Sequence, residues 1–124
     1  MFIAGSNVNI TDSDFKNCSV DVTLSPDGDD LPYGGALYVL GENTTVSDCT
    51  FDNCTAIQGG IIYVQGNNTK VDNATCGNSS ATKYGGAFYI YGVNATISNS
   101  SVENTNATLS GGAIYIDGIN ADIE

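Results

Sequence analysis

The side chains that could do chemistry in this chain are mainly carboxylates and phenols, because histidine and arginine are absent. The only basic side chains are Lys16, Lys70 and Lys83. A Ser-His-Asp triad and a histidine-bound metal ion are therefore excluded. Neighbouring acids such as Asp48 and Asp52 could flank a glycosidic bond, but solvated carboxylates on an acidic surface are the simpler interpretation. We expect no catalysis, no metal and no cofactor in this segment.

Four tyrosines recur at a nearly constant spacing and are the most suggestive candidate for a binding surface. Tyr38, Tyr63, Tyr89 and Tyr115 follow one another at intervals of 25, 26 and 26 residues. Flat aromatic rings on one face of a protein could stack on sugar rings. The preferred alternative is that the rings pack on each other, cover a sheet and add local stability.

A second candidate contact site is the segment at residues 19–33, "SVDVTLSPDGDDLPY", which interrupts the repeat described below. Asp27, Asp29 and Asp30 carry hard oxygen ligands that suit weak calcium binding. The segment lacks the distal Glu of an EF-hand loop, so a plain surface loop is the preferred interpretation. Loops on rigid scaffolds often carry recognition, and the insertion therefore stays a candidate contact site.

The four cysteines are separated by 31, 5 and 22 residues, which fits no zinc-binding pattern. Cys18 and Cys54 occupy equivalent positions in adjacent repeats, where a disulfide is geometrically allowed. Free, packed thiols are the preferred alternative, so the redox compartment stays open. Cys76 stands where other repeats have phenylalanine, and we expect it to be a small buried hydrophobic residue.

These residues are positioned by an internal repeat, which we identify before any local structure. The segment "GGALYVLG" from Gly34 returns as "GGIIYVQG" from Gly59, "GGAFYIYG" from Gly85 and "GGAIYIDG" from Gly111. A fifth copy begins at Phe2, which gives about four and a half repeats of 25–26 residues. Both ends of the chain fall inside a repeat, so we expect residues 1–124 to be one segment of a longer repeat protein.

Each repeat alternates apolar and polar residues over short stretches, as strands with one buried face do. Leu37 and Val39 remain apolar in every copy, which predicts an inward face. The next position accepts Gln65 and Asp117 and therefore faces water. The repeated tyrosine shares that outward parity.

Two columns of asparagine mark the corners between strands. Asparagine tolerates a positive φ better than most residues other than glycine, and stacked side-chain amides can bond to each other along a column. One column follows each Gly-x pair, and the other lies two residues after a third apolar column. The expected ladder residues are Asn7, Asn43, Asn68, Asn94 and Asn120, and Asn17, Asn53, Asn78 and Asn104.

Three short strands per repeat, separated by corners, predict an all-β fold in which a single chain winds into a parallel β-helix. Successive coils would stack at about 4.8 Å. A leucine-rich repeat has an overlapping period, but it requires leucines at fixed positions and often a helix. The mainly β-branched and aromatic columns of this chain favour the β-helix.

The tetrapeptides "GGAL", "GGAF" and "GGAI" from Gly34, Gly85 and Gly111, together with "FKNC" and "FDNC" from Phe15 and Phe51, resemble repetitive surface proteins of the pectate-lyase-like superfamily. The repeats are most similar in style to adhesin-like proteins of methanogenic archaea. They are more distantly similar to chlamydial polymorphic outer-membrane proteins, whose second motif is one residue longer. The resemblance covers the whole chain and implies a right-handed helix, export to the cell surface, and a role in adhesion or as a stalk.

The charge and composition narrow the choice of partners. A net charge of −11 repels the phosphates of nucleic acids and disfavours anionic membranes, and no apolar run is long enough to span a bilayer. We expect an extracellular glycoprotein, with ten Asn-x-Ser/Thr sequons, that contacts a cell-surface glycan or a protein of a host or partner cell. Uncapped coils could also associate end to end.

The alternative function is a fragment of a polysaccharide-binding or polysaccharide-degrading β-helix protein. Enzymes of the resembled superfamily combine clustered acids with basic residues. This chain cannot assemble such a set from its own residues, because its only basic residues are three lysines. Any catalysis would therefore lie on coils outside the segment.

Overall fold

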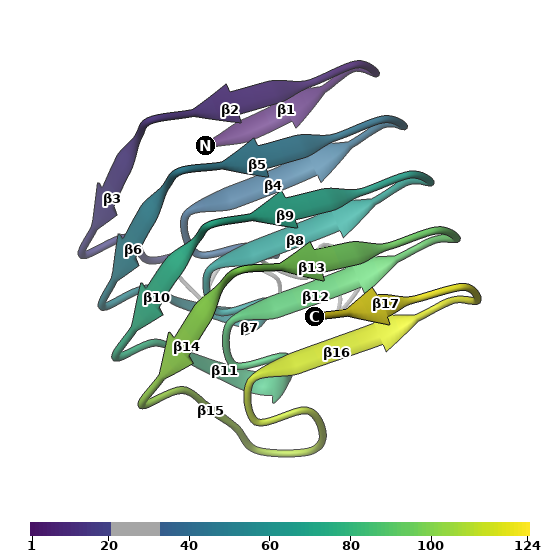
Figure 1. Cartoon of the computed structure of the whole chain (residues 1–124). Helices are drawn as coiled ribbons and strands as arrows, with labels where there is room; N and C mark the ends of the chain where they lie inside the picture. The colour runs from purple at the N-terminus through teal and green to yellow at the C-terminus, as the bar shows by residue number, and fades with distance from the viewer. Residues whose placement is uncertain (21–32) are drawn as a thin grey trace.

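A computed structural model of the 124-residue chain describes residues 1–20 and 33–124. The described residues form seventeen short strands and no helix. All pairings between strands are parallel, and the strands stack into a solenoid (Figure 1). The all-β, parallel, repetitive architecture expected from the sequence is thereby confirmed. The candidate calcium ligands Asp27, Asp29 and Asp30 lie outside the described residues.

The strands form four sheets that run along the solenoid. Sheet 1 consists of β1 (Phe2–Ala4), β4 (Leu37–Leu40), β8 (Ile62–Gln65), β12 (Phe88–Tyr91) and β16 (Ile114–Asp117). Sheet 2 consists of β2 (Asn9–Thr11), β5 (Thr45–Ser47), β9 (Lys70–Asp72), β13 (Thr96–Ser98) and β17 (Asp122–Ile123). Sheet 3 consists of β3 (Asp14–Lys16), β6 (Thr50–Asp52), β10 (Thr75–Gly77) and β14 (Ser101–Glu103). Sheet 4 consists of β7 (Thr55–Gln58), β11 (Ser80–Tyr84) and β15 (Asn106–Ala107).

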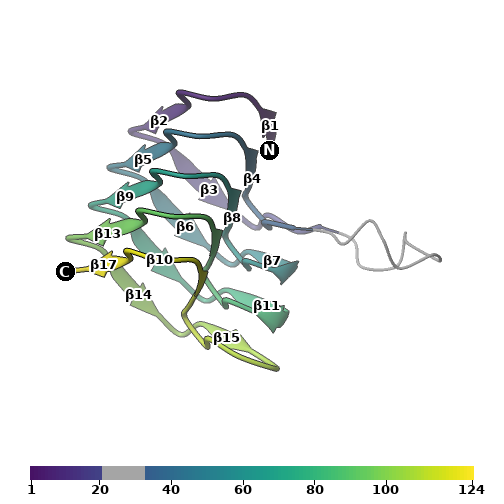
Figure 2. The same ribbon diagram turned by 90° about the vertical axis from the view of Figure 1, so that its right-hand side faces the viewer.

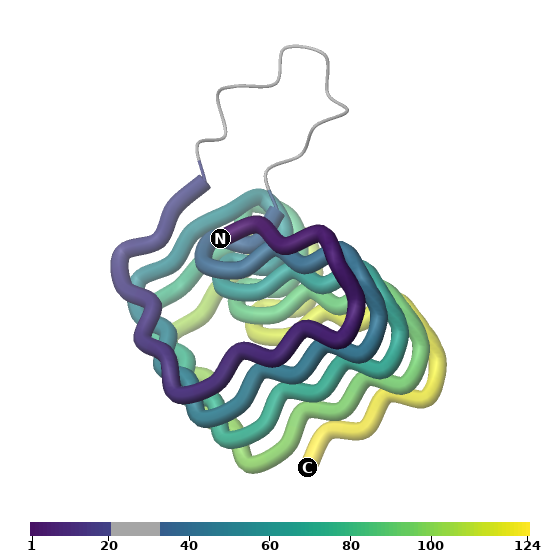
Figure 3. The backbone as a smooth tube through the Cα atoms, turned by 90° about the horizontal axis from the view of Figure 1, so that it is seen from above, coloured from purple at the N-terminus to yellow at the C-terminus, as the bar shows by residue number. Residues whose placement is uncertain are grey.

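The register of the sheets reproduces the columns read from the repeat. Val39 pairs with Val64, Val64 with Ile90, and Ile90 with Ile116. Viewed from above in Figure 3, successive turns repeat the same outline, and each is displaced by a small step from the turn before it. Equivalent residues therefore form straight columns, which is the physical requirement for any ladder or stacked array in this protein.

The prediction of three strands per turn is wrong, because a fourth sheet closes each complete turn (Figure 2). Its inward column is Ala56, Ala81 and Ala107, and pairing aligns these three residues in adjacent turns. A column of alanines carries little apolar signal, so the segment resembles a polar loop in the sequence. On this side of the first turn, the described residues 19 and 33 form bridges to Thr55 and Gln58, respectively.

Three corners in a complete turn place a non-glycine residue in the left-handed region of φ, and the first glycine of each Gly-Gly pair takes that region at a fourth corner. Thirteen non-glycine residues within the described ranges have positive φ, and all are asparagine or aspartate. In one turn they are Asn43, Asp48 and Asn53, which are five residues apart. The residue after each of these corners, Thr44, Cys49 or Cys54, is buried. The first and third corner columns were predicted from the sequence. The middle column was not, because its residues change from aspartate in the first two turns (Asp12 and Asp48) to asparagine in the next two (Asn73 and Asn99).

The lumen of the solenoid is the hydrophobic core. Leu37, Val39, Val46 and Phe51 are fully buried in one turn, and equivalent residues fill the next turns. All four cysteines are free thiols, of which Cys18 is half-buried and the other three are buried. Cys76 pairs with Phe51 in sheet 3 and is a buried apolar residue, as its column predicts.

Candidate functional sites on the outer faces of sheets 1 and 3

The repeated tyrosines lie in register on sheet 1 and point away from the lumen. Tyr38 pairs with Tyr63, Tyr63 with Tyr89, and Tyr89 with Tyr115. They alternate along the strands with the buried core residues, as the sequence parity requires. Nevertheless, only 6 % of Tyr63 and 9 % of Tyr89 is exposed to solvent.

Other aromatic rings cover these tyrosines. The ring centroids of Tyr63 and Tyr89 lie 4.8 Å apart at an interplanar angle of 8°, and those of Tyr89 and Tyr115 lie 5.0 Å apart at 20°. Tyr33 stacks on Tyr63 from the other side of that array, at 4.2 Å and 26°. The faces of Tyr63 and Tyr89 are therefore occupied by neighbouring rings, which leaves little ring surface for a sugar.

Burial also raises the pKa values of Tyr63 and Tyr89, the two most enclosed phenols of this array. Loss of solvation raises the pKa of Tyr89 to about 12, and the nearby carboxylate of Asp117 and phenol of Tyr115 act in the same direction. Burial raises the pKa of Tyr63 still further, with contributions from Tyr33 and Tyr89. Tyr63 and Tyr89 are thus neutral at physiological pH, and their stacked rings form a packing layer over sheet 1.

The first asparagine column forms a continuous hydrogen-bonded ladder along an exposed corner. Asn43 Nδ2 donates to Asn7 Oδ1 at 3.0 Å, and Asn68 Nδ2 donates to Asn43 Oδ1 at 2.9 Å. The same bond links Asn94 to Asn68 and Asn120 to Asn94, at 2.9 and 3.2 Å. Each amide faces solvent rather than the lumen, and the column ties successive turns together from outside.

The second column is interrupted. Asn53 donates to Asn17 and Asn104 donates to Asn78, at 2.8 and 3.3 Å. Asn78 Nδ2, however, donates to Asp52 Oδ1 at 2.8 Å, not to the equivalent Asn53. This bond turns the Asp52 side chain toward the corner of the following turn, beside Gly77.

Sheet 3 carries a groove of about 420 Å³ on its outer face. Two rows of outward residues form its floor. Thr50, Thr75 and Ser101 make one row, and Lys16, Asp52, Gly77 and Glu103 make the other. The Thr50 hydroxyl donates to the Asp14 carboxylate, and the amides of Asn78 and Asn104 line the rim.

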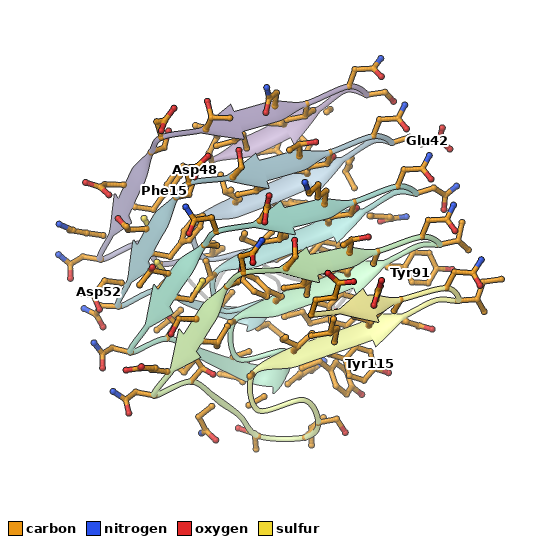
Figure 4. All side chains as sticks on the ribbon, viewed as in Figure 1. Phe15, Glu42, Asp48, Asp52, Tyr91 and Tyr115 are labelled. Atoms are coloured by element: carbon orange, nitrogen blue, oxygen red, sulfur yellow. The ribbon has the colours of Figure 1, made fainter. Side chains whose placement is uncertain are left out.

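The groove is hollow because Gly77 has no side chain between Asp52 and Glu103. Pairing places Asp52, Gly77 and Glu103 on three successive strands. A Cβ atom on Gly77 would meet only Asp52 Oδ1, at an ordinary 3.6 Å. Glycine is therefore not required there by backbone geometry, and its absence of a side chain serves to open the surface. Figure 4 shows Asp52 at this corner of the solenoid.

Sequence reasoning missed this groove. The signal was present, because glycine inside a strand often marks a close approach of a ligand or another chain. The outward column of sheet 3 changes from Lys16 and Asp52 to Gly77 and Glu103, which is a break in an otherwise bulky row. The hollow itself depends on the strands on either side of Gly77, which carry Asp52 and Glu103.

A separate polar cluster lies on sheet 2 and concerns stability rather than binding. Hydrogen bonds from Asn99 and Ser98, at 2.8 and 2.9 Å, and an ion pair with Lys70 at 3.2 Å surround the Asp72 carboxylate. These interactions lower the pKa of Asp72 to about 2, with the bond from Asn99 the largest cause. Asp72 is therefore ionised throughout the physiological range.

Within residues 1–20 and 33–124, no group of three or more metal-ligating side chains is arranged to hold an ion. The same described ranges contain no helix that is long and apolar enough to cross a membrane. Comparison of the chain with protein-family models, curated proteins and solved structures finds no match.

Proposed function

We propose that this chain is a structural and adhesive segment of an extracellular surface protein, wound as a right-handed parallel β-helix of about four and a half coils. Catalysis is not part of its role. The solenoid supplies a stiff scaffold, and the observation that carries the adhesive role is the groove over Gly77. The resemblance of the repeats to adhesin-like proteins supports the same proposal.

The groove suits a neutral or amino-substituted glycan. Thr50, Thr75 and Ser101 present hydroxyls at successive strand spacings of about 4.8 Å, next to the carboxylates of Asp52 and Glu103. These groups can donate and accept several hydrogen bonds to sugar hydroxyls. Acidic polysaccharides would be repelled, because carboxylates flank the hollow and the chain carries a net charge of −11.

The test is a glycan array probed with the native chain and with a groove-filling variant. Gly77→Thr adds a side chain that the backbone accepts, and we expect it to weaken glycan binding about tenfold, as the loss of one or two good hydrogen bonds would. Gln65→Thr alters an exposed position on sheet 1 and is the matched control that retains binding. Absence of binding to any glycan, or equal binding by native chain and Gly77→Thr, would contradict the proposal.

A polysaccharide-processing role is the second candidate, and one observation favours it. Asp52 and Glu103 stand on strands on either side of Gly77 and both line the groove. Glycosidases place two carboxyl groups on either side of the bond that they cleave. A reducing-sugar assay with the glycans that the chain binds on the array distinguishes the two functions. Cleavage of these glycans by this chain would overturn a purely adhesive role.

Extracellular glycosylation belongs to the same proposal, and the ladders limit where it can occur. In seven of the ten sequons the Asn Nδ2 atom, which would carry the glycan, already donates a hydrogen bond; these are Asn43, Asn53, Asn67, Asn73, Asn78, Asn94 and Asn99. We expect glycans at Asn9, Asn17 or Asn106 after expression in a glycosylating host. Peptide mass mapping that finds them mainly on the ladder donors would contradict this.

A further inference from the structure

Two tyrosines outside the repeated column extend the aromatic array of sheet 1. Tyr33 and Tyr84 each precede a Gly-Gly pair and lie in one column of sheet 4, where both pair with Gln58 between them. Each ring reaches across to the repeated tyrosine of the following turn. Tyr33 stacks on Tyr63 at 4.2 Å, and Tyr84 lies 5.0 Å from Tyr115 at an interplanar angle of 35°.

The pairs Tyr33–Tyr63 and Tyr84–Tyr115 differ in their exposure to solvent. Tyr63 is nearly enclosed, whereas Tyr84 and Tyr115 are both half-buried and reach solvent. Figure 4 shows Tyr115 at the border of the solenoid, on the terminal strand of sheet 1. An oxidant can therefore approach the Tyr84–Tyr115 pair, and water can accept the proton that an oxidised phenol releases.

We propose that Tyr84 and Tyr115 form an oxidative cross-linking site, at which a haem-peroxidase-type oxidant using hydrogen peroxide joins the two rings as dityrosine. Each phenol loses one electron and one proton. The two radicals form one carbon–carbon bond between ring positions ortho to the hydroxyls, and the ortho hydrogens move to the oxygens as the rings regain aromaticity. Two phenols and one hydrogen peroxide thus give one dityrosine and two waters.

The geometry favours coupling within one chain over coupling between chains. Residues 84 and 115 belong to different turns, yet stacking in register holds their rings in contact before any oxidation occurs. Preorganised groups react as if at very high local concentration. The product would be a covalent bond between two turns of the solenoid, which resists separation of those turns. This inference is independent of glycan binding.

The experiment oxidises the dilute full chain with a haem peroxidase and hydrogen peroxide. We expect dityrosine fluorescence in the monomer fraction after size exclusion, a mass loss of two hydrogen atoms, and a cross-linked peptide that joins residues 84 and 115. Tyr84→Phe and Tyr115→Phe should each abolish this product, because phenylalanine keeps the ring packing but cannot form a phenoxyl radical. Circular dichroism of each variant verifies that the fold is retained.

Tyr91→Phe is the matched control. Tyr91 is 48 % exposed, and no ring contact involves it among the described residues. Its replacement should leave the monomeric cross-link unchanged. The proposal is overturned if dityrosine forms only between chains, if it persists in Tyr84→Phe and Tyr115→Phe, or if the cross-linked peptide joins Tyr33 to Tyr63 instead.

Discussion

At the residue scale, this protein is shaped by the few side chains that accept a left-handed backbone. The corners use asparagine or aspartate because these residues tolerate positive φ better than others and can hydrogen-bond at the same time. Asn68 combines both properties, with a φ of 57° and amide bonds to the turns on either side. The contributions of the backbone conformation and of the ladder hydrogen bonds to stability can therefore be measured separately by replacing Asn68 with different residues.

The first prediction makes that separation at Asn68. Asn68→Gly keeps the backbone conformation and removes the ladder bonds, so we expect a loss of about 1 kcal/mol of unfolding free energy. Asn68→Ala should cost about 1–2 kcal/mol more, because alanine also strains the left-handed conformation. Urea unfolding measures both values. Equal losses for the two variants would show that the corner conformation carries no cost.

The second prediction compares two glycines of the same turn: Gly60, at the corner between β7 and β8, and Gly77, in β10. A Cβ atom on Gly60 would lie 2.2 Å from the carbonyl oxygen of Gly86 and 2.6 Å from that of Ser80, so Gly60→Ala forces the neighbouring backbone to move. Gly77→Ala meets no such obstacle. We expect Gly60→Ala to cost well over 1 kcal/mol and Gly77→Ala to be neutral or stabilising by about 0.5–1 kcal/mol. Thermal unfolding of the two variants measures the difference. Similar changes in melting temperature for Gly60→Ala and Gly77→Ala would contradict this prediction.

At the scale of elements, the outer faces of sheets 1 and 3 differ in their chemistry. Sheet 1 is covered by its own aromatic rings, and sheet 3 exposes hydroxyls and carboxylates around a hollow. The tyrosines that looked most like a sugar platform are thus a second apolar layer outside the lumen. Stability and binding should consequently respond to mutations on different sheets.

The third prediction tests this division with Tyr63 and Tyr89. Replacing either with serine removes a ring that is more than nine-tenths buried, and we expect a loss of about 3 kcal/mol of unfolding free energy, similar to aromatic truncations in cores. Glycan binding at 10 °C below the lowered melting temperature should be unchanged. Loss of binding with unchanged thermal stability would instead make the tyrosines the contact surface.

At the scale of the whole molecule, the narrow lumen holds several ionisable groups in their neutral form. Burial is the largest cause that raises the pKa of Cys76 to about 12 and that of Cys54 to about 11, from an ordinary value of 9.0. Since unfolding restores the lower pKa, the unfolded thiols ionise first as the pH rises. The stability of the fold is therefore complete below about pH 9 and falls as the pH rises toward 12.

The fourth prediction follows from this fall in stability at high pH. Urea unfolding between pH 8 and 11 should show a free energy of unfolding that is constant up to about pH 9 and falls above it, with each buried thiol contributing up to about 1.4 kcal/mol per pH unit. Cys76→Val should reduce the slope, because Val102 shows that the same column accepts valine. A slope identical to that of the native chain would mean that Cys76 ionises equally in both states.

The fifth prediction concerns the two end faces. The unpaired edges of β1 and β16 border exposed apolar side chains, including Phe2 and Ile123, and open sheet edges invite pairing with another chain. We expect the isolated chain to associate end to end as its concentration rises, as measured by sedimentation velocity. Ile123→Lys should suppress this association through charge, whereas Lys in place of the exposed Gln65 on a side face should not.

Much of the architecture could be predicted from the sequence, because the turns stack in register and the repeat period therefore fixes where each residue lies. A residue that recurs every 25 or 26 positions must lie above its counterpart, so the inward columns and the asparagine columns follow from spacing alone. The fourth sheet could not be predicted in this way. Its alanines fill a narrow side of the lumen, and their small size is explained only by the space that the other three sheets leave.

The candidate sites show the same boundary between what the sequence determined and what tertiary structure decided. Repetition alone placed Tyr38, Tyr63, Tyr89 and Tyr115 on one outward column, but whether their faces stay open depends on rings from the neighbouring turns, including Tyr33 and Tyr84. Likewise, Gly77 is an ordinary strand residue until Asp52 and Glu103 stand beside it. Periodicity specifies which residues are neighbours along the axis, whereas the shape and exposure of a surface arise from how those neighbours pack.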